Sequence, residues 1–368
     1  MMKKTLNPFD LIDLYAKTRF GRQKTAHYAS QIISCPRSNW FAFKGVTPSN
    51  PVNVSSLFKM EVGSAIGKIK TRAMDAALKM WYAEHPEVLF RPLMEILHDD
   101  CPQMVQDILD ASVREERAFD LNTITPFTIP EVPFREYIPG LEYPLSGRVD
   151  SVANMPYFED NGRLALDTVA LMMEDKSSSA ASTRMVKEKG DTWITYQLQH
   201  FAYHHRYPEL ITEMDYVDRE WGYPYRFGME TLGSGVTVFQ PGGPGRMGTP
   251  LASKLPMSPW QFIVARLRWM EELMKSETPP GRHVMTTIKA PHSRGDFKEF
   301  TEIKLVLPEH PTFMADRDKY LLYVNSDGSM IPNRGQTAEG IHYRANTCGT
   351  FCRFRDYCMK LDGVTLRD

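Results

Sequence analysis

The chain alternates between stretches with helical and with strand-like spacing of apolar residues. The longest helical pattern runs from Leu57 to Tyr82, where apolar residues recur every three or four positions although Gly63 and Gly67 interrupt them. Two interior glycines cost a helix about 1 kcal/mol each relative to alanine, so they indicate the close approach of another helix or of a ligand. Further helices are expected over 102–119, 193–207 and 259–275.

Strand-like patterns fill the middle of the chain. Residues 127–138 alternate in part and contain two prolines, which is typical of an edge strand. The next two strands are expected over 145–152 and 164–174, joined by a turn at 159–162. Residues 233–256 are rich in glycine and proline and predict a long loop. Later strands are expected over 214–221, 283–288, 300–307 and 320–324.

This order of elements predicts an α/β fold with a mixed central sheet flanked by helices. The 368 residues allow one large domain or two ordinary ones. We expect three parts: a helical N-terminal region over 1–126, the sheet-containing core over 127–325, and a C-terminal cysteine segment over 326–368. The last segment is expected to pack on the N-terminal region.

Charge and hydropathy narrow the class of protein. Lys and Arg total 44 against 45 Asp and Glu, so any contact with nucleic acid must use local basic patches. No apolar run is long enough to cross a membrane, and Asp10 and Asp13 interrupt what could have been a signal peptide after Lys3 and Lys4. We therefore expect a cytoplasmic protein without a membrane partner, in which cysteines are reduced.

Charged residues close two of the central strands, where apolar residues are the rule. Asp150 lies in the first, and Glu174 and Lys176 follow the apolar run of the second. Alternation puts Glu174 and Lys176 on one face, whereas Asp175 points the other way and offers a metal only its backbone carbonyl. Carboxylates hold Mg²⁺ or Mn²⁺, and a neighbouring lysine can orient water or neutralise charge. The pattern predicts metal-dependent hydrolysis of phosphodiesters.

The helix that follows adds polar groups to this pattern. Gln199 and Tyr203 lie four residues apart, so they share a helix face and could meet DNA. Gln197, with Phe201 as its partner, is an alternative to Gln199. Each motif alone is more often ordinary surface, but their order along the chain favours a site. Further contacts with DNA are expected from Arg184, Lys187, Gln197 and Arg206, although a solvated helix edge would look the same.

Four of the five cysteines are grouped at the two ends of the chain. Cys35 lies near the start, and Cys348, Cys352 and Cys358 lie within eleven residues near the finish. Such thiolates can bind a [4Fe–4S] cluster or Zn²⁺, and spacing alone leaves both open. Cys101 is left over, and a buried apolar position is the default for it.

Taken together, these motifs resemble the iron–sulfur branch of the RecB-like PD-(D/E)XK nucleases. This branch includes the CRISPR-associated adaptation exonuclease and the nuclease domains of AddAB-type recombination enzymes. The resemblance covers about residues 35–358 and implies a restriction-endonuclease-like fold and a [4Fe–4S] cluster on the four grouped cysteines. It also implies a metal on Asp150 and Glu174, a catalytic lysine in Lys176, and a DNA-facing role for Gln199 and Tyr203.

The resemblance implies a metal-dependent DNA nuclease, most simply an exonuclease acting on ends or single strands. Its setting would be DNA repair or recombination, phage DNA processing or CRISPR adaptation, with a helicase, recombination or integrase protein as partner. The family helix commonly reads Gly-x-x-x-His, whereas here Gly63 is followed by Gly67. A catalytically impaired member that binds DNA or a partner is therefore one alternative, and a zinc-stapled structural protein is another.

Overall fold

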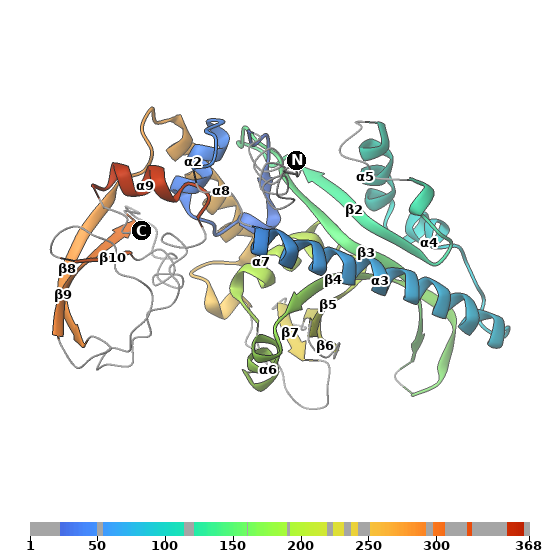
Figure 1. The fold of residues 1–368 in the computed structure, drawn as a ribbon. Coiled ribbons are helices and arrows are strands. Elements are labelled where there is room, and N and C mark those ends of the chain that lie inside the picture. The colour runs from blue at the N-terminus through green and yellow to red at the C-terminus, as the bar shows by residue number, and fades with distance from the viewer. Residues whose placement is uncertain are drawn as a thin grey trace, which may run out of the picture. The chain divides into compact units, whose positions relative to one another are not determined.

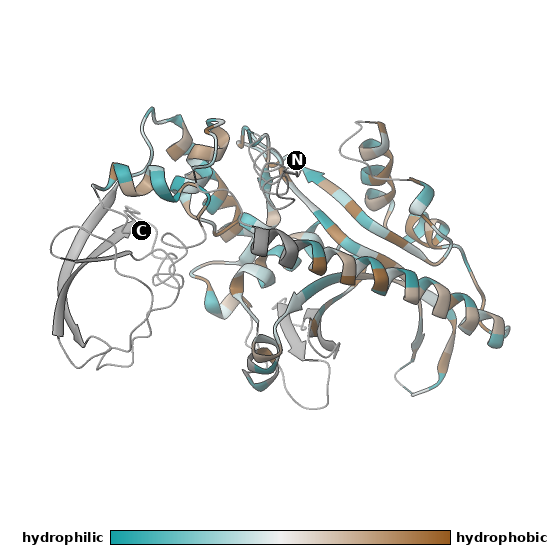
Figure 2. Cartoon of the chain, in the orientation of Figure 1, coloured by the Kyte–Doolittle hydropathy of each residue, from teal (hydrophilic) through white to brown (hydrophobic). Residues whose placement is uncertain are grey.

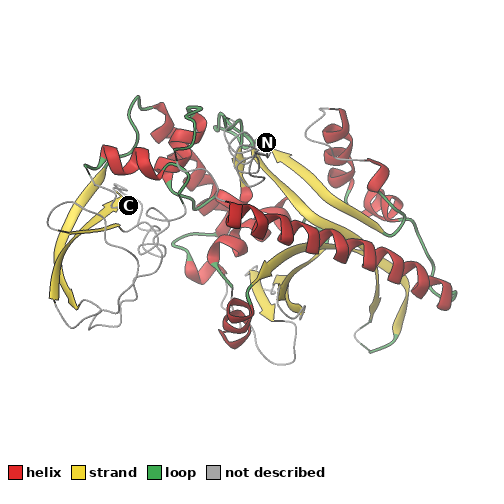
Figure 3. Ribbon diagram, viewed as in Figure 1, coloured by secondary structure: helices red, strands yellow, loops and turns green. Residues whose placement is uncertain are grey.

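The computed structural model describes residues 23–49, 54–113, 121–159, 161–189, 192–218, 224–231, 237–241, 251–291, 297–305, 322–325 and 352–363. The chain forms two compact units. The sheet unit comprises residues 26–33 and 59–267, and the terminal unit comprises residues 1–25, 34–58 and 268–368. This grouping differs from the three segments expected from the sequence, because most of the N-terminal helical region belongs with the central sheet. Figures 1 and 3 show the elements.

The sheet unit contains a mixed sheet of seven described strands. They are β1 (His27–Tyr28), β2 (Thr128–Glu136), β3 (Leu145–Phe158), β4 (Leu164–Ser178), β5 (Ile211–Asp218), β6 (Pro224–Thr231) and β7 (Thr237–Pro241). The order is β1-β3-β4-β5-β6-β7, and β2 also pairs with β3. The β1–β3 and β4–β5 pairs are parallel and the others antiparallel. The expected mixed α/β architecture is confirmed.

The strands of the sheet unit follow the sequence pattern in part: β1 and β6 were not predicted, and β3, β4 and β7 differ from the prediction. Apolar and polar positions alternate only in part along β2, as predicted and as the bands of Figure 2 show. Both β3 and β4 are longer than predicted, so Asp150 and Lys176 lie inside strands and not at their ends. Residues 237–241, predicted as part of a loop, form β7. Thr237, Val238 and Phe239 are strand-forming residues, and pairing with β6 satisfies their backbone groups.

The turn between β3 and β4 has the predicted hairpin chemistry. Gly162 has a φ of +77°, and its backbone N–H donates to the Glu159 carbonyl at 2.8 Å. Glycine adopts this left-handed conformation without a steric cost, which is why it suits the position. The turn joins β3 to β4, and an irregularity between Pro156 and Phe158 then shifts the register to the one that holds through Ser151 and Met173.

Helices cover the sheet. They are α3 (Val54–Glu84), α4 (Leu93–Asp100), α5 (Pro102–Val113), α6 (Ala180–Lys189), α7 (Ile194–Arg206) and α8 (Pro259–Lys275), with short 3-10 turns η1 (Ala29–Gln31), η2 (Leu121–Thr123) and η3 (Leu251–Lys254). The predicted start of α8 at Pro259 is confirmed, since proline suits the first helical position. Within the described ranges, no helix combines the length and apolarity needed to span a membrane.

The two faces of β4 pack against different helices. Leu171 and Met173 share a hydrophobic cluster with Leu78 of α3, whereas Met172 lies in the main core with Leu198 of α7. Burying each such side chain contributes about 1.5–3 kcal/mol. Because successive strand residues alternate between faces, the polar residues that follow Met173 must also point toward α3 or α7 in turn.

The terminal unit has its own sheet and core. Its described elements are α2 (Pro36–Phe43), β8 (Arg282–Pro291), β9 (Phe297–Leu305), β10 (Leu322–Asn325) and α9 (Arg355–Leu361), and its three strands form an antiparallel sheet of order β10-β9-β8. Trp40 and Phe41 of α2 pack with Cys352, Phe354 and Cys358 in one buried cluster. The N-terminal and C-terminal parts of the sequence therefore meet in this unit.

Candidate active site

The register of β3 against β4 brings two carboxylates together. Ser151 pairs with Met173 in this antiparallel ladder, so the next residues along the two strands are Asp150 and Glu174. The backbone N–H of Asp175 donates to Asp150 Oδ2 at 2.6 Å, which fixes the Asp150 side chain against β4. Asp150 and Glu174, which are separated by 24 positions in the sequence, thus become neighbours.

On the α7 face, Glu174 lies at the centre of a hydrogen-bonded group. Lys176 Nζ donates to Glu174 Oε1 and, at 3.2 Å, to Gln199 Oε1. Gln199 Nε2 donates to Glu174 Oε1 at 2.6 Å and to the Tyr203 hydroxyl at 2.8 Å. Strand alternation placed Glu174 with Lys176, and one helical turn placed Gln199 with Tyr203, as the sequence predicted. Their convergence into one group is a property of the fold.

Burial governs the electrostatics of this group. Burial, followed by the negative charge of Glu174, raises the pKa of Asp150 well above its ordinary value. Burial also raises the pKa of Glu174, although Lys176 opposes the shift. Burial lowers the pKa of Lys176, but Glu174 and Asp150 outweigh that effect and the net pKa is raised. Two carboxylates therefore share one ammonium, and an additional cation would stabilise the second negative charge.

The oxygen atoms of the two carboxylates fit a hard divalent cation. Glu174 is 2% exposed, and its Oε2 is buried without a hydrogen-bond partner. A buried carboxylate oxygen left in this way is costly unless a cation contacts it. In the described ranges no three His, Cys, Asp or Glu side chains form a metal-binding group. Mg²⁺ commonly uses one or two carboxylates and completes its shell with water, so the pair is sufficient.

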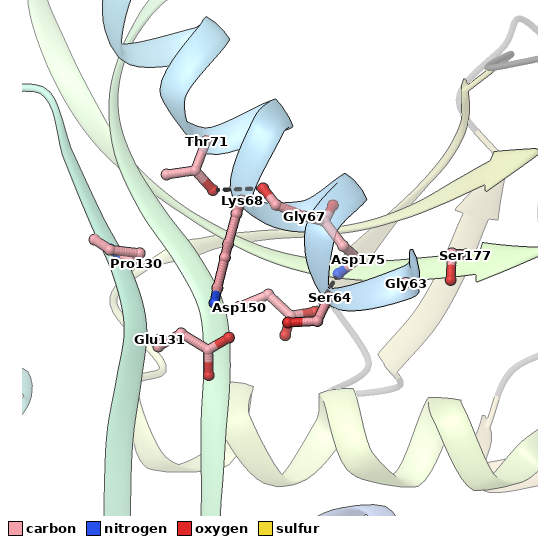
Figure 4. A pocket seen from close by; sticks show the side chains of 10 residues that line it. All are labelled: Gly63, Ser64, Gly67, Lys68, Thr71, Pro130, Glu131, Asp150, Asp175 and Ser177. Atoms are coloured by element: carbon pink, nitrogen blue, oxygen red, sulfur yellow. Dashed lines mark hydrogen bonds between the residues drawn. The ribbon is translucent and has the colours of Figure 1, made fainter. Parts of the chain in front are cut away.

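On the α3 face, a cavity of about 490 Å³ opens beside Asp150. Figure 4 shows Lys68 and Glu131 directed toward the same space as Asp150. The lining residues are Gly63, Ser64, Gly67, Lys68, Thr71, Pro130, Glu131, Asp150, Asp175 and Ser177. The cavity combines carboxylates, one lysine and small residues, so a polar, charged ligand suits it better than an apolar one.

The two glycines of α3 lie against β4. A Cβ at Gly63 would be 2.7 Å from Ser177 Oγ, closer than real Cβ contacts, whereas one at Gly67 would be 3.8 Å from Asp175 Oδ2. Gly63 is therefore explained by the close approach of α3 to the sheet. Gly67, where the resembling family commonly has histidine, faces Asp175 without offering a side chain.

Three charged residues around the cavity were not predicted from the sequence. Lys70 Nζ donates to Asp215 Oδ2 at 2.5 Å and also to Asp175 Oδ1. Glu131 lies between the paired positions Pro130 and Val132 of β2 and has a φ of +53°, a conformation costing about 1–3 kcal/mol. Lys70 could have been noticed because it lies one turn after Gly67. Neither Asp215 nor Glu131 carries a local signal.

The glycine before Asp150 is explained by packing. A Cβ at Gly147 would lie 2.3 Å from Phe134 Cε1 and 2.7 Å from Tyr203 Cε1. Phe134 and Tyr203 are 3% and 1% exposed, and their rings meet edge to face at 5.2 Å. Gly147 therefore lets Tyr203 reach the position from which its hydroxyl contacts Gln199.

The two candidate glutamines have different surroundings. Gln199 contacts the charged group, whereas Gln197 Nε2 donates to the Thr192 carbonyl at 2.9 Å and its Oε1 accepts from Lys254 at 2.9 Å. Gln197 is 0% exposed. The structure thus brings Gln199, and not Gln197, to Glu174. The predicted contact of Gln197 with DNA stays a prediction.

The basic residues predicted to contact DNA lie in varied environments. Arg184 is exposed on α6 and pairs with Glu188 at 2.7 Å. The side chain of Lys187 lies outside the described residues. Arg206 is half-buried and donates to both carboxylate oxygens of Asp107, at 2.9 and 2.8 Å. Arg184 is the more accessible of the two that are described.

The cysteines of the terminal unit are described in part. Cys35 is the residue preceding α2 and is buried, as are Cys352 and Cys358. Cys348 lies outside the described residues, so the proposed four-cysteine set is not complete in the described chain. Cys101 is buried in the main core of the sheet unit, and burial raises its pKa to about 12. An apolar packing role for Cys101 agrees with that position.

Comparison with known proteins adds little. No family model matches the chain, and no curated protein matches it. Among solved crystal structures, that of a protein named SSO0001 is similar over 73% of this chain and 88% of that one, with 15% sequence identity and a TM-score of 0.27. A likeness at this level carries no argument about function, which must be argued from the residues of this chain.

Proposed function

We propose that this chain is a divalent-metal-dependent deoxyribonuclease whose centre is Asp150, Glu174 and Lys176. One observation carries the proposal: a buried carboxylate, a second, partly buried carboxylate and a partly buried ammonium converge, and one oxygen of Glu174 has no partner. Strongly perturbed, mutually coupled acids are typical of catalytic sites. The resemblance to the iron–sulfur branch of the RecB-like PD-(D/E)XK nucleases, with its restriction-endonuclease-like fold, supports the same function.

Asp150 and Glu174 would hold Mg²⁺ or Mn²⁺, with the backbone carbonyl of Asp175 as a further ligand. When bound, the ion would polarise the phosphate and lower the pKa of a coordinated water. Hydrogen bonds orient both carboxylates before a metal binds. The N–H of Asp175 donates to Asp150. Gln199 and Lys176 donate to Glu174 Oε1, which leaves Oε2 available. Partners that orient metal-binding groups in this way typically affect metal affinity or activity 10- to 100-fold.

Lys176 acts as a cation in this scheme. Because its net pKa is raised, the ammonium keeps its proton at neutral pH. A protonated lysine can stabilise the negative charge that develops on a phosphate under attack. Its ammonium also lies 5.0 Å from the ring centroid of Tyr196, which helps to fix its position.

DNA ends or single strands are the proposed substrate. Trp193, 39% exposed, meets the Tyr196 ring at 5.9 Å and offers a surface on which an unpaired base could stack. Lys68 in the cavity and Arg184 on α6 are available to phosphates. The glycine-rich residues 241–245 lack the lysine and Ser or Thr of a Walker loop, so unwinding would come from a partner such as a helicase. A cytoplasmic setting fits these partners.

The terminal unit is proposed to hold a structural [4Fe–4S] cluster on Cys35, Cys348, Cys352 and Cys358, with Zn²⁺ as the alternative. Cys352 and Cys358 are buried with aromatic residues of the helix that Cys35 precedes. Cysteine thiolates in a protected apolar shell suit either metal. The ligands would join segments more than 300 residues apart, and so stabilise the unit.

A second candidate is a catalytically impaired relative that binds DNA or a partner protein. The observation that favours it is Gly67, which faces Asp175 but cannot supply a ligand. Binding of DNA without turnover in any divalent metal would support this candidate, and robust turnover would exclude it.

Cleavage of end-labelled single-stranded and duplex DNA with Mn²⁺ or Mg²⁺ tests the proposal. Glu174→Ala should lower the rate at least about 10²-fold, a loss typical of removing a group that stabilises the transition state. Glu95→Ala, which removes a carboxylate from the exposed surface of α4, is the matched control and should cleave like the wild type. Equal rates for Glu174→Ala and the wild type would remove the proposed centre.

A further inference from the structure

Lys70 of α3 lies between two carboxylates of the sheet. Its ammonium donates to Asp215 Oδ2 at 2.5 Å and to Asp175 Oδ1. The side chains of Lys70, Asp175 and Asp215 are 24%, 11% and 2% exposed, so the three charges are largely removed from water. Charges in such a position interact more strongly than they would at a surface.

The register of the sheet makes the two carboxylates neighbours. Asp175 and Asp215 are direct partners in the parallel β4–β5 ladder. Two ionised carboxylates at this spacing repel each other, and burial adds to the cost, so the arrangement requires a cation. Lys70 supplies that cation from α3.

The same Asp175 belongs to the proposed centre through its backbone. Its N–H donates to Asp150 Oδ2 at 2.6 Å, while its side chain points to α3. At Gly67 the helix gives the centre no side chain, and Lys70, three residues later, reaches the carboxylate that Gly67 faces. Helix α3 therefore contributes the ammonium of Lys70 to the centre, and Gly67 contributes no metal ligand.

We propose that Lys70 is a positioning residue that acts as a built-in cation, so that the centre takes up one divalent ion, on Asp150 and Glu174. The inference rests on the proposed metal-dependent function and adds the stoichiometry of the metal. Lys70 contacts both Asp175 and Asp215 and balances one of their two negative charges; without it the two carboxylates would form a second acidic site, of which Asp175 lies beside Asp150. Two-metal sites place their ions about 3.5–4 Å apart and need carboxylates on both sides.

The consequence of removing Lys70 is specific. In Lys70→Met, Asp175 and Asp215 lose their ammonium, and Asp175 remains beside Asp150 in the lining of the cavity. Asp175 Oδ2 is already buried without a hydrogen bond. The variant should therefore bind a second divalent ion and should be less stable than the wild type without metal, with the loss recovered when metal is added.

Counting bound Mn²⁺ by electron paramagnetic resonance in the full-length protein tests the inference without relying on activity. We expect one ion per chain for the wild type and two for Lys70→Met. Lys79→Met is the matched control, since it removes an exposed lysine that lies on the same helix but outside the cavity lining, and should bind one ion. Asp215→Asn should also bind one ion, with an affinity within about threefold of the wild type, because Asp215 is not a ligand.

The outcomes separate the inference from the proposed function. Two ions in the wild type, or one in a folded Lys70→Met, would overturn the inference and leave the nuclease proposal standing. If Lys70→Met does not fold, Asp215→Asn decides: loss of its ion would show that this carboxylate is a ligand and would overturn the inference. No Mn²⁺ bound to the wild type, together with no cleavage, would overturn both.

Discussion

Substitution of Gly147, three residues before Asp150, should lower both the free energy of unfolding and the cleavage rate. In Gly147→Ala the new methyl would lie 2.3 Å from Phe134 Cε1 and 2.7 Å from Tyr203 Cε1. Both atoms belong to buried rings packed edge to face, so neither can swing away as a flexible side-chain end would. Either the rings or β3 must move.

The magnitude follows from overpacking. Inserting one carbon into a filled core costs about 1–3 kcal/mol, and the reduced freedom of the unfolded chain returns about 0.4–1 kcal/mol. A net loss of about 1–2 kcal/mol in the free energy of unfolding is expected. Displacement of the Tyr203 ring would also disturb its 2.8 Å hydrogen bond with Gln199, so the cleavage rate should fall in the same variant.

Urea unfolding measures the stability, and a second glycine of the same unit provides the control. A Cβ at Gly67 would make only an ordinary contact, 3.8 Å from Asp175 Oδ2. Alanine there gains about 1 kcal/mol of helix propensity, so Gly67→Ala should be at least as stable as the wild type. Replacement of glycine by alanine should thus lower the free energy of unfolding at position 147 and leave it unchanged or raised at position 67.

Combining Gly147→Ala with Phe134→Leu makes the test sharper. The smaller side chain opens space at the atom that would lie closest to the new methyl, so the two stability losses should be less than additive. A Gly147→Ala protein with wild-type stability and wild-type cleavage would refute the packing argument. So would strict additivity with Phe134→Leu.

Two further predictions concern acid stability and the cysteines. His200 is buried, and burial lowers its pKa to about 3. Between about pH 6.5 and pH 3, the imidazole of His200 is therefore protonated in the unfolded chain but stays neutral in the folded chain. The free energy of unfolding, measured with urea, should fall from pH 6.5 toward pH 3, and that of His200→Gln should fall less steeply by about 1.4 kcal/mol per pH unit; parallel slopes would contradict this. Protein purified without oxygen should be brown and Cys352→Ser should lose the colour, whereas a colourless wild type with equimolar zinc would favour the zinc alternative.

Local pattern determined much of the fold. The apolar spacing of α3, α7 and α8, the proline that begins α8 and the glycine turn between β3 and β4 depend on nearby residues, so they can be read from the sequence. The pairs Glu174 with Lys176 and Gln199 with Tyr203 follow from the same periodicities. Local pattern failed at β7, where pairing with β6 prevailed over a glycine- and proline-rich composition.

Only the tertiary structure decided which local pairs meet. The β3–β4 register brings Asp150 to Glu174, and the packing of α7 brings Gln199 to both Glu174 and Lys176. The choice of Gln199 over Gln197 depends on that packing, because both residues suit the sequence pattern. Long-range pairing of this kind is set by the burial of whole faces, which no short stretch of sequence contains.

The ion group of Lys70, Asp175 and Asp215 also depends on the tertiary structure. Lys70, Asp175 and Asp215 are separated by more than 100 and by 40 positions, and each alone looks like ordinary surface charge. The parallel β4–β5 register and the approach of α3 turn them into one buried ion group. The sequence determined which residues could do chemistry, and the fold decided which of them share a low-dielectric space in which a missing or added charge matters.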